Sequence, residues 1–295
     1  MRNLSRAARA GFTLVELLVA ITVAGFVMAA LYRVLEGNQR FYRAQSQIIG
    51  VQENVRAVAQ ILTGELRELD ASGGDIIHME QTHITIKAMR SFSIACTAPN
   101  VAAAQITVRN ALTFGYRSMD AARDSVLLFR EGDPRTGSDD VWLRAPIGGM
   151  AASSCTDGAA GTRLTLTGLT ATQLGPNGAL RDAGVLLGAP VRTFEVVSYR
   201  LYNDGTGVWW LGMRTHSGGA WSSISPVAGP LRANDGVGLQ YLNSSGAVTA
   251  TPTAVARIQL TVRGRSTQPI NIPGRPAGYF QDSIVTQVAL RNNVR

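Results

Sequence analysis

The sequence has little of what enzymes and metal sites are usually built from. Its 295 residues include only two cysteines, three histidines and a single lysine. A nucleophile elbow, a phosphate-binding loop and a dinucleotide fingerprint are all missing, and no second cysteine pair has zinc-ligand spacing. We therefore expect no catalytic residue, no cofactor and no metal site, and we expect that the protein is not an enzyme.

The histidines do not suggest a metal site by their spacing. His78 and His83 lie on opposite faces if both belong to one strand, because side chains alternate along a strand. His216 is far away in the sequence. The acidic loop 131–140 lacks EF-hand spacing, so we interpret it as a solvated turn and keep calcium binding as the alternative.

Positive charge is abundant but dispersed. The formal net charge is +8, nearly all of it from arginine, with Lys87 the only lysine. No window gathers five or six basic residues, as an arm that binds nucleic acid usually does. Trp209, Trp210 and Trp221, with Arg214, suggest an aromatic surface for single-stranded nucleic acid or a hydrophobic substrate. Adjacent side chains on a strand point to opposite faces, so at most one of Trp209 and Trp210 joins this surface and the other is expected in the core. We keep nucleic acid as an alternative, weakly supported partner.

Composition favours a folded, turn-rich chain. Hydrophobic residues make up 45% of the sequence, which is enough for a sizeable core. The 31 glycines and 11 prolines are spread along the chain and form no tract. This distribution is typical of a β structure with many turns.

The N-terminal segment is the most informative one. From Phe12 to Leu31 the sequence is apolar apart from Glu16, a stretch of roughly 30 Å as a helix, long enough to cross a bilayer. Arginines flank both ends, so charge does not set the orientation. A cleaved signal peptide and a plain signal anchor are the alternatives. Neither explains Glu16, since a charge in such a helix costs about 2.5 to 3.5 kcal/mol.

The run Gly11-Phe12-Thr13-Leu14-Val15-Glu16 resembles the leader motif of type IV prepilins and pseudopilins. The resemblance implies that residues 1–11, which include three arginines, form a leader. A prepilin peptidase is then expected to cut between Gly11 and Phe12 on the cytoplasmic side and to methylate the new Phe12 amine. The helix stays on the mature chain, in the inner membrane and later in a filament at the cell surface.

The same resemblance gives Glu16 a role in assembly. In a filament, its carboxylate can pair with the terminal amine of Phe12 of a neighbouring subunit, because an unpaired charge is costly in a dry helical core. The expected partners are other pilins, met through the helix, and the inner-membrane assembly platform. Gly25 is shared with many pilins, whereas no proline precedes Pro99. Many major pilins have a proline in this helix, so its absence favours a minor subunit.

An amphipathic pattern continues beyond the apolar stretch. Apolar residues recur every three or four positions on one face of the expected helix. They are Ile48, Val51, Val55, Val58, Leu62, Leu66 and Leu69. Charged and amide residues, Glu65 among them, are expected on the other face. We expect one helix that ends near Ser72-Gly73-Gly74, with residues 12–32 in the membrane or filament core, 33–72 amphipathic, and 73–295 in a periplasmic β-rich domain.

Period-two alternation then predicts strands and an α+β fold. The expected strands are 82–87, 105–109, 126–129, 163–167, 193–202, 208–214, 238–242, 254–263 and 284–290. The turn Asn203-Asp204-Gly205-Thr206-Gly207 predicts a hairpin. Cys96 and Cys155 suggest a single disulfide, with two buried thiols as the alternative.

The length and the C-terminal pattern resemble PilW-type minor pilins and J-type pseudopilins of type II secretion. The segments 193–201, 235–241 and 255–262 carry this looser resemblance. It implies a structural subunit that primes or joins pilus assembly. A pseudopilin and a pilus-associated module for DNA uptake or adhesion remain the alternatives.

Overall fold

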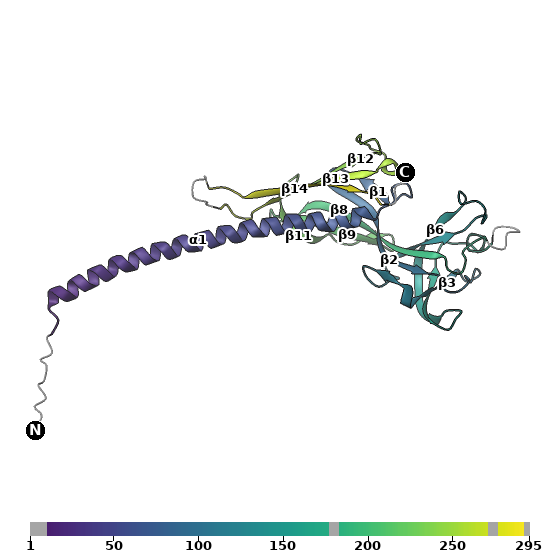
Figure 1. Cartoon of the computed structure of the whole chain (residues 1–295), viewed down its shortest axis with the longest axis horizontal. Coiled ribbons are helices and arrows are strands. Elements are labelled where there is room, and N and C mark those ends of the chain that lie inside the picture. The colour runs from purple at the N-terminus through teal and green to yellow at the C-terminus, as the bar shows by residue number, and fades with distance from the viewer. Residues whose placement is uncertain (1–10, 177–182, 271–276, 292–295) are drawn as a thin grey trace, which may run out of the picture. The chain divides into compact units, whose positions relative to one another are not determined.

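The computed structural model describes residues 11–176, 183–270 and 277–291 (Figure 1). The helix α1 (Leu14–Arg67) precedes a large antiparallel β-sheet, which confirms the predicted α+β class. Contacts divide the chain into two compact units. The first contains the helix up to Gly50 and the segment Ser266–Phe280, and the second contains Val51–Arg265 and the chain from Gln281 onward.

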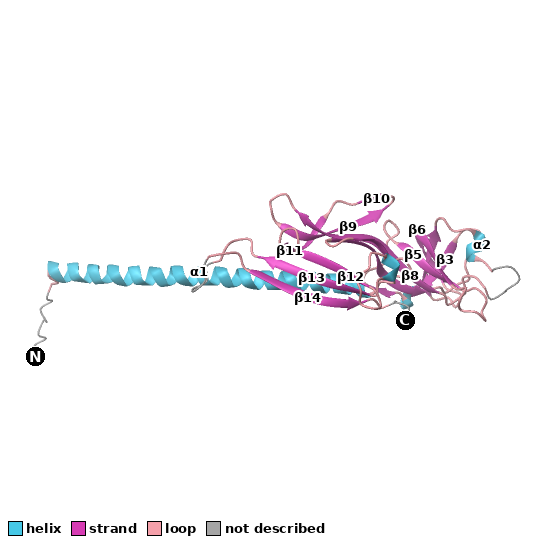
Figure 2. Ribbon diagram, turned by 90° about the horizontal axis from the view of Figure 1, so that it is seen from above, coloured by secondary structure: helices cyan, strands magenta, loops and turns pink. Residues whose placement is uncertain are grey.

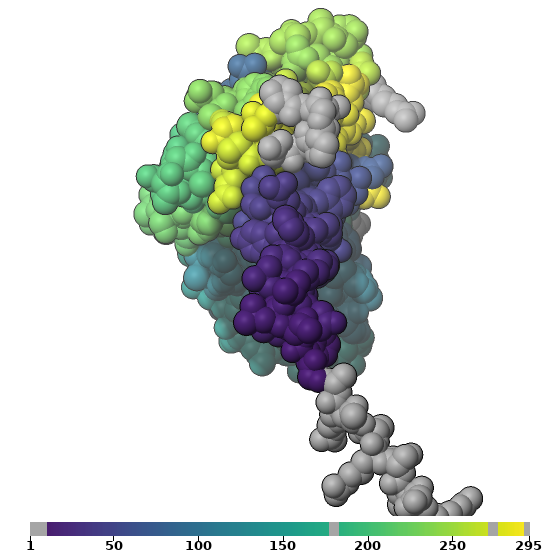
Figure 3. Space-filling view, turned by 90° about the vertical axis from the view of Figure 1, so that its left-hand side faces the viewer, coloured from purple at the N-terminus to yellow at the C-terminus, as the bar shows by residue number. Residues whose placement is uncertain are grey.

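In the first unit, the start of α1 is exposed in the residues that the structure describes. Every residue from Gly11 to Arg43 is exposed except Glu36, which is half-buried. The helix is long and apolar enough to span a membrane, and its first turns, in purple, lie uncovered on the face that Figure 3 shows. In the same unit, the Thr267 hydroxyl donates a hydrogen bond to the Gln47 side chain, 3.3 Å away. So much exposed apolar surface is stable only in lipid or against other helices.

In the second unit, the last turns of α1 pack on the sheet through the predicted stripe. All of its members from Val51 to Leu66 are buried. Gly264 of strand β13 (Arg257–Arg265) lies where the helix comes closest. A Cβ atom at Gly264 would stand 2.5 Å from a Val55 methyl group and 2.8 Å from a Val51 methyl group. Glycine is therefore required there for the helix to reach the sheet.

The helix ends at Arg67, earlier than the predicted end near Ser72-Gly73-Gly74. A hydrogen-bonded turn replaces the last expected turn of helix. The Asp70 amide donates to the Asp75 carboxylate at 2.9 Å, and the Gly73 amide donates to the Asp70 carboxylate at 2.9 Å. Gly74 follows with a φ of 74°, which favours glycine. Aspartate side chains thus compete with the helix for backbone donors.

Fourteen strands form the sheet in the described residues. They are β1 (Ile76–Met79), β2 (His83–Ile94), β3 (Gln105–Arg109), β4 (Phe114–Gly115), β5 (Ser125–Arg130), β6 (Val141–Ser154), β7 (Ala160–Leu166), β8 (Pro190–Asn203), β9 (Trp209–Ser217), β10 (Ala220–Trp221), β11 (Ser225–Leu231), β12 (Val237–Leu242), β13 and β14 (Gln281–Ala289). Three short helical turns accompany them: η1 (Asn110–Leu112), α2 (Ala171–Leu174) and η2 (Pro252–Ala254).

The long strand β8 joins two parts of this sheet. Along one edge it pairs with β2. On the other edge, its first residues pair with β5 and its later residues pair with β9. From β5 the sheet continues through β6 and β7 to β3, and from β9 it continues through β11 and β13 to β12 (Figure 2). The predicted hairpin between residues 202 and 208 is the β8–β9 connection.

The β3–β7 part has its own apolar core. Its buried residues include Ile106, Leu128, Leu164 and Leu174. A disulfide joins Cys96, just after β2, to Cys155, just after β6. The Thr156 amide also donates to the Cys96 carbonyl oxygen, so the two segments are held together by covalent and hydrogen bonds.

A buried cluster of charges ties α1 to the sheet in the second unit. Arg90 of β2 donates to both oxygens of Glu65 on α1, at 2.9 and 3.1 Å, and to Glu195 of β8 at 3.1 Å. Arg117 donates to Glu195 at 3.1 Å, and the Tyr199 hydroxyl donates to Glu65 at 3.2 Å. The expectation that Glu65 lies on the helix face opposite the apolar stripe is therefore wrong, because Arg90 and Tyr199 on the sheet bind its carboxylate.

Candidate functional site at the start of the helix

The predicted cleavage site lies just outside α1. Gly11, Phe12 and Thr13 precede the helix and are exposed, with Phe12 84% exposed. Arg2, Arg6 and Arg9 of the expected leader lie outside the described residues. A peptide bond before the first helical turn is not held by helical hydrogen bonds, so the Gly11–Phe12 bond is open to a peptidase.

Glu16 and Thr13 form a capping box at the first turn. The Thr13 amide and hydroxyl donate to the Glu16 carboxylate at 2.9 and 3.0 Å. In return, the Glu16 amide donates to the Thr13 hydroxyl at 3.3 Å. This reciprocal pattern satisfies backbone donors that the helix leaves free. The sequence carries the signature of this box, a threonine followed three residues later by glutamate, and this local signal is sufficient to predict it.

The sequence at the start of α1 and just before it matches a known family motif. Residues 6–32 match the prokaryotic N-terminal methylation motif. This segment is a type IV prepilin-like signal. The predicted resemblance is thereby confirmed at the level of the signal, which covers the N-terminal residues and not the β-rich part. Comparison with curated proteins and with solved structures gives no match.

The prepilin-like signal implies processing by a prepilin peptidase and assembly with other pilins in the membrane. The bare apolar start of α1 fits membrane anchoring. A signal of this type indicates a pilin-like or pseudopilin-like protein. It also accounts for an apolar helix start that is exposed in the described residues.

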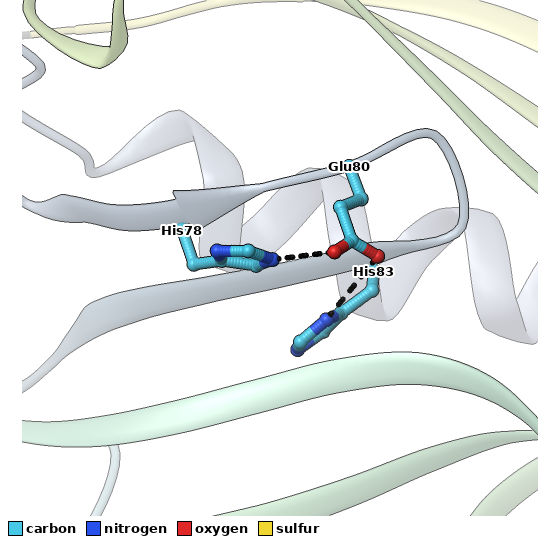
Figure 4. A group of neighbouring side chains, drawn as sticks. All are labelled: His78, Glu80 and His83. Atoms are coloured by element: carbon cyan, nitrogen blue, oxygen red, sulfur yellow. Dashed lines mark hydrogen bonds and ion pairs between the residues drawn. The ribbon is translucent and has the colours of Figure 1, made fainter.

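The histidines are arranged differently from the prediction. His78 lies at β1 and His83 at the start of β2, on the two arms of one hairpin. Their rings are 4.9 Å apart, and the Glu80 carboxylate pairs with both of them (Figure 4). The premise that they face opposite sides of one strand is therefore wrong. Burial and then the nearby Arg200 lower the pKa of His83.

The tryptophans do not act as one surface. The Arg214 guanidinium lies over the Trp221 ring, 4.5 Å from its centre, and His216 packs edge-on against the same ring. Trp210 instead donates its indole N–H to Asp204 in the β8–β9 turn at 2.9 Å. Of these three tryptophans, Trp221 is thus the one whose ring lies against an arginine, Arg214.

The acidic loop 131–140 is held by hydrogen bonds between its own residues. Its carboxylates accept hydrogen bonds from backbone amides: Asp140 from Gly132 at 3.1 Å, and Asp139 from Asp133 at 2.8 Å. These bonds use carboxylate oxygens that a calcium ion would need. They favour the interpretation of this segment as a turn.

Proposed function

We propose that the protein is a minor type IV pilin, a structural subunit that primes or joins pilus assembly after processing. The observation that carries this proposal is the prepilin-like signal placed on a helix whose described residues from Leu14 to Arg43 are exposed, apart from the half-buried Glu36. Such a helix needs other apolar helices or lipid. The absence of proline between Leu14 and Arg67 supports a minor subunit over a major one.

In this proposal, processing creates the charge that Glu16 binds. Cleavage after Gly11 leaves a positive amine on Phe12 in the inner membrane, with the β-rich part in the periplasm. When the subunit joins a filament, the Glu16 carboxylate pairs with the Phe12 amine of a neighbour, and the helices pack together. An ion pair in apolar surroundings sets the register, because a shifted neighbour leaves both charges unpaired.

The capping box allows the charge of Glu16 to be tested apart from its hydrogen bonds. Glu16→Gln keeps a side chain that can cap the Thr13 amide but removes the charge, whereas Glu16→Ala removes both. We expect both variants to be processed normally and both to be absent from sheared filaments. Glu36→Gln, which changes another carboxylate on the same helix, is the matched control and is expected to assemble.

Processing is followed by the mass of the mature chain, and incorporation by immunoblotting of the sheared filament fraction. Normal incorporation of Glu16→Gln with loss of Glu16→Ala would show that only the cap matters. The pairing proposal would then be wrong, while the pilin proposal would stand. If a deletion strain instead shows defective type II secretion but intact piliation, the result would favour the alternative, a J-type pseudopilin.

A second candidate, a binding module for DNA uptake or adhesion, has one favourable observation. Arg214 stacked on Trp221, which is 38% exposed, offers a cation and an aromatic face to an unstacked base. Single-stranded DNA is expected to bind the full chain in a salt-dependent manner, and Trp221→Ala is expected to weaken this binding. Absence of binding at low salt would remove this candidate.

A further inference from the structure

The turn between β1 and β2 gathers three potential metal ligands that the proposed function does not use. They are His78, Glu80 and His83, and their ligand atoms all lie within 4.8 Å of one another. His78 Nε2 is 2.8 Å from one Glu80 oxygen, and His83 Nδ1 is 3.8 Å from the other. In Figure 4 a dashed line joins each ring to a different oxygen of the Glu80 carboxylate, which lies beside both rings.

The backbone of this turn is fixed on several sides. The Glu80 amide donates to the His83 carbonyl oxygen at 2.8 Å, which closes the turn. The Tyr241 hydroxyl donates to the Glu80 carbonyl oxygen at 3.0 Å, and the Leu239 amide donates to the Gln81 carbonyl oxygen at 2.7 Å. Strand β12 therefore holds the turn that carries the ligands. A preformed backbone reduces the entropy lost when an ion binds.

His83 has the surroundings of a metal-binding histidine. Its Nε2 atom lies 2.8 Å from the buried Ser198 hydroxyl and 3.2 Å from the Thr85 hydroxyl. Hydroxyl partners at Nε2 leave Nδ1 directed at Glu80. Histidines that bind metals usually make such a hydrogen bond with their second nitrogen, which fixes the ring.

We propose that His78, Glu80 and His83 bind one divalent transition-metal ion, zinc being the probe of choice, with water in the remaining position. Two imidazoles and one carboxylate are a ligand set that zinc accepts. Ligand atoms around one zinc ion lie roughly 3.4 Å apart, given bonds of about 2.1 Å. The three side chains reach this spacing between ligand atoms by small rotations about their side-chain bonds. The His78 side chain is 48% exposed, so it has room to rotate.

The charges around the site set the expected strength of binding. Glu80 supplies one negative charge, while Arg200, the cross-strand neighbour of His83, and Arg214 oppose a cation. We therefore expect moderate affinity, in the micromolar range, at one ion per chain. A bound ion joins the two arms of the hairpin, so binding is expected to raise the melting temperature.

The experiment uses the full chain in detergent, stripped with a chelator and then titrated with zinc by isothermal calorimetry. Stoichiometry is checked by metal analysis after gel filtration. The variants His78→Asn, Glu80→Gln and His83→Asn remove the ligands one at a time. His216→Asn is the matched control, because it removes the remaining histidine, which lies on β9 and is not one of the three proposed ligands.

We expect one zinc per chain in the wild type and in His216→Asn, and at least a tenfold weaker affinity in each ligand variant. His78 and Glu80 are largely exposed, so their variants are expected to keep the melting temperature of the metal-free protein. No binding by the wild type, or equal binding by His78→Asn and Glu80→Gln, would overturn the proposal. Equal weakening by His216→Asn would do so too, since it would indicate nonspecific association. None of these results bears on processing or filament assembly.

Discussion

The charge cluster between α1 and the sheet allows a quantitative prediction for Arg90→Met. The Arg90 side chain is 8% exposed and binds two carboxylates, Glu65 and Glu195, whose side chains are 15% and 4% exposed. Although burial disfavours its charge, Glu65 and Glu195 together raise the pKa of Arg90. The guanidinium therefore remains charged in the folded protein. Methionine replaces its volume without its charge.

The expected loss is about 3 kcal/mol. Removing one partner of a buried ion pair typically costs about 3 to 5 kcal/mol, because the other charge is left unpaired. Here the loss lies at the lower end, since Glu195 keeps Arg117 and Glu65 keeps the Tyr199 hydroxyl. At roughly 2 to 4 °C per kcal/mol for a chain of this size, the melting temperature should fall by about 6 to 12 °C.

Thermal unfolding of the full chain in detergent, followed by circular dichroism, measures this fall. Arg291→Met is the control, because Arg291 pairs with Glu68 at the surface, where the two side chains are 69% and 48% exposed, and a pair of this kind contributes about 1 kcal/mol or less. Adding Glu65→Gln to Arg90→Met should recover part of the loss, since it removes a carboxylate left without its arginine. A fall of less than about 2 °C in Arg90→Met, or no difference from Arg291→Met, would refute the reasoning.

Other predictions concern the packing, the disulfide and pH. Gly264→Val should destabilise the protein by about 1 to 3 kcal/mol through overpacking, measured by thermal unfolding, whereas an unchanged midpoint would mean that the helix shifts freely. Replacing both cysteines by serine should cost about 4 kcal/mol and abolish any effect of reductant on the melting temperature. Hydrogen bonds from Thr206 and then Trp210 lower the pKa of Asp204 to about 2. Its contribution to stability is therefore present above the unfolded pKa near 3.8 and lost as the pH falls toward about 2. The indole N–H resonance of Trp210 should shift across that interval, and Asp204→Asn should abolish the shift.

Local patterns identified the elements whose sequences alternate regularly. The segment 105–109 is β3 without change, and the other eight predicted strands each overlap an observed one. Strand β13 begins at Arg257, later than predicted, because Pro252–Ala254 forms the short helix η2. The helix was recognisable from its apolar stripe, although its end was placed too late.

The strands that the sequence did not reveal have compositions that work against a strand. β6 contains Gly148 and Gly149, and β11 contains Pro226 and Pro230, residues that normally weaken or interrupt strands. Both strands form because neighbouring strands supply their hydrogen bonds, with register shifts close to these residues. The short strands β1, β4 and β10 were also missed, because segments of two to four residues are too short to show the alternation of polar and apolar residues.

Side-chain partners were the least predictable part. The Glu65–Arg90 pair joins residues 25 positions apart on different elements, and no local pattern marks it. The cluster of His78, Glu80 and His83 depends on a turn between two strands. The expectation that both histidines belong to one strand did not include this turn. In contrast, Gly11, Phe12 and Glu16 follow from a contiguous motif that requires no tertiary structure to be recognised.

Under the proposed function, the bonds between Glu16 and Thr13 also affect the energetics of joining a filament. A subunit waiting in the lipid does not carry a bare carboxylate, because its own first turn already satisfies that group. Incorporation then exchanges one set of partners for another, and the net gain from the ion pair is smaller than for an unsatisfied charge. Such an exchange has a modest free-energy change in either direction. It would let a subunit leave the filament and return to the lipid without stranding its charge.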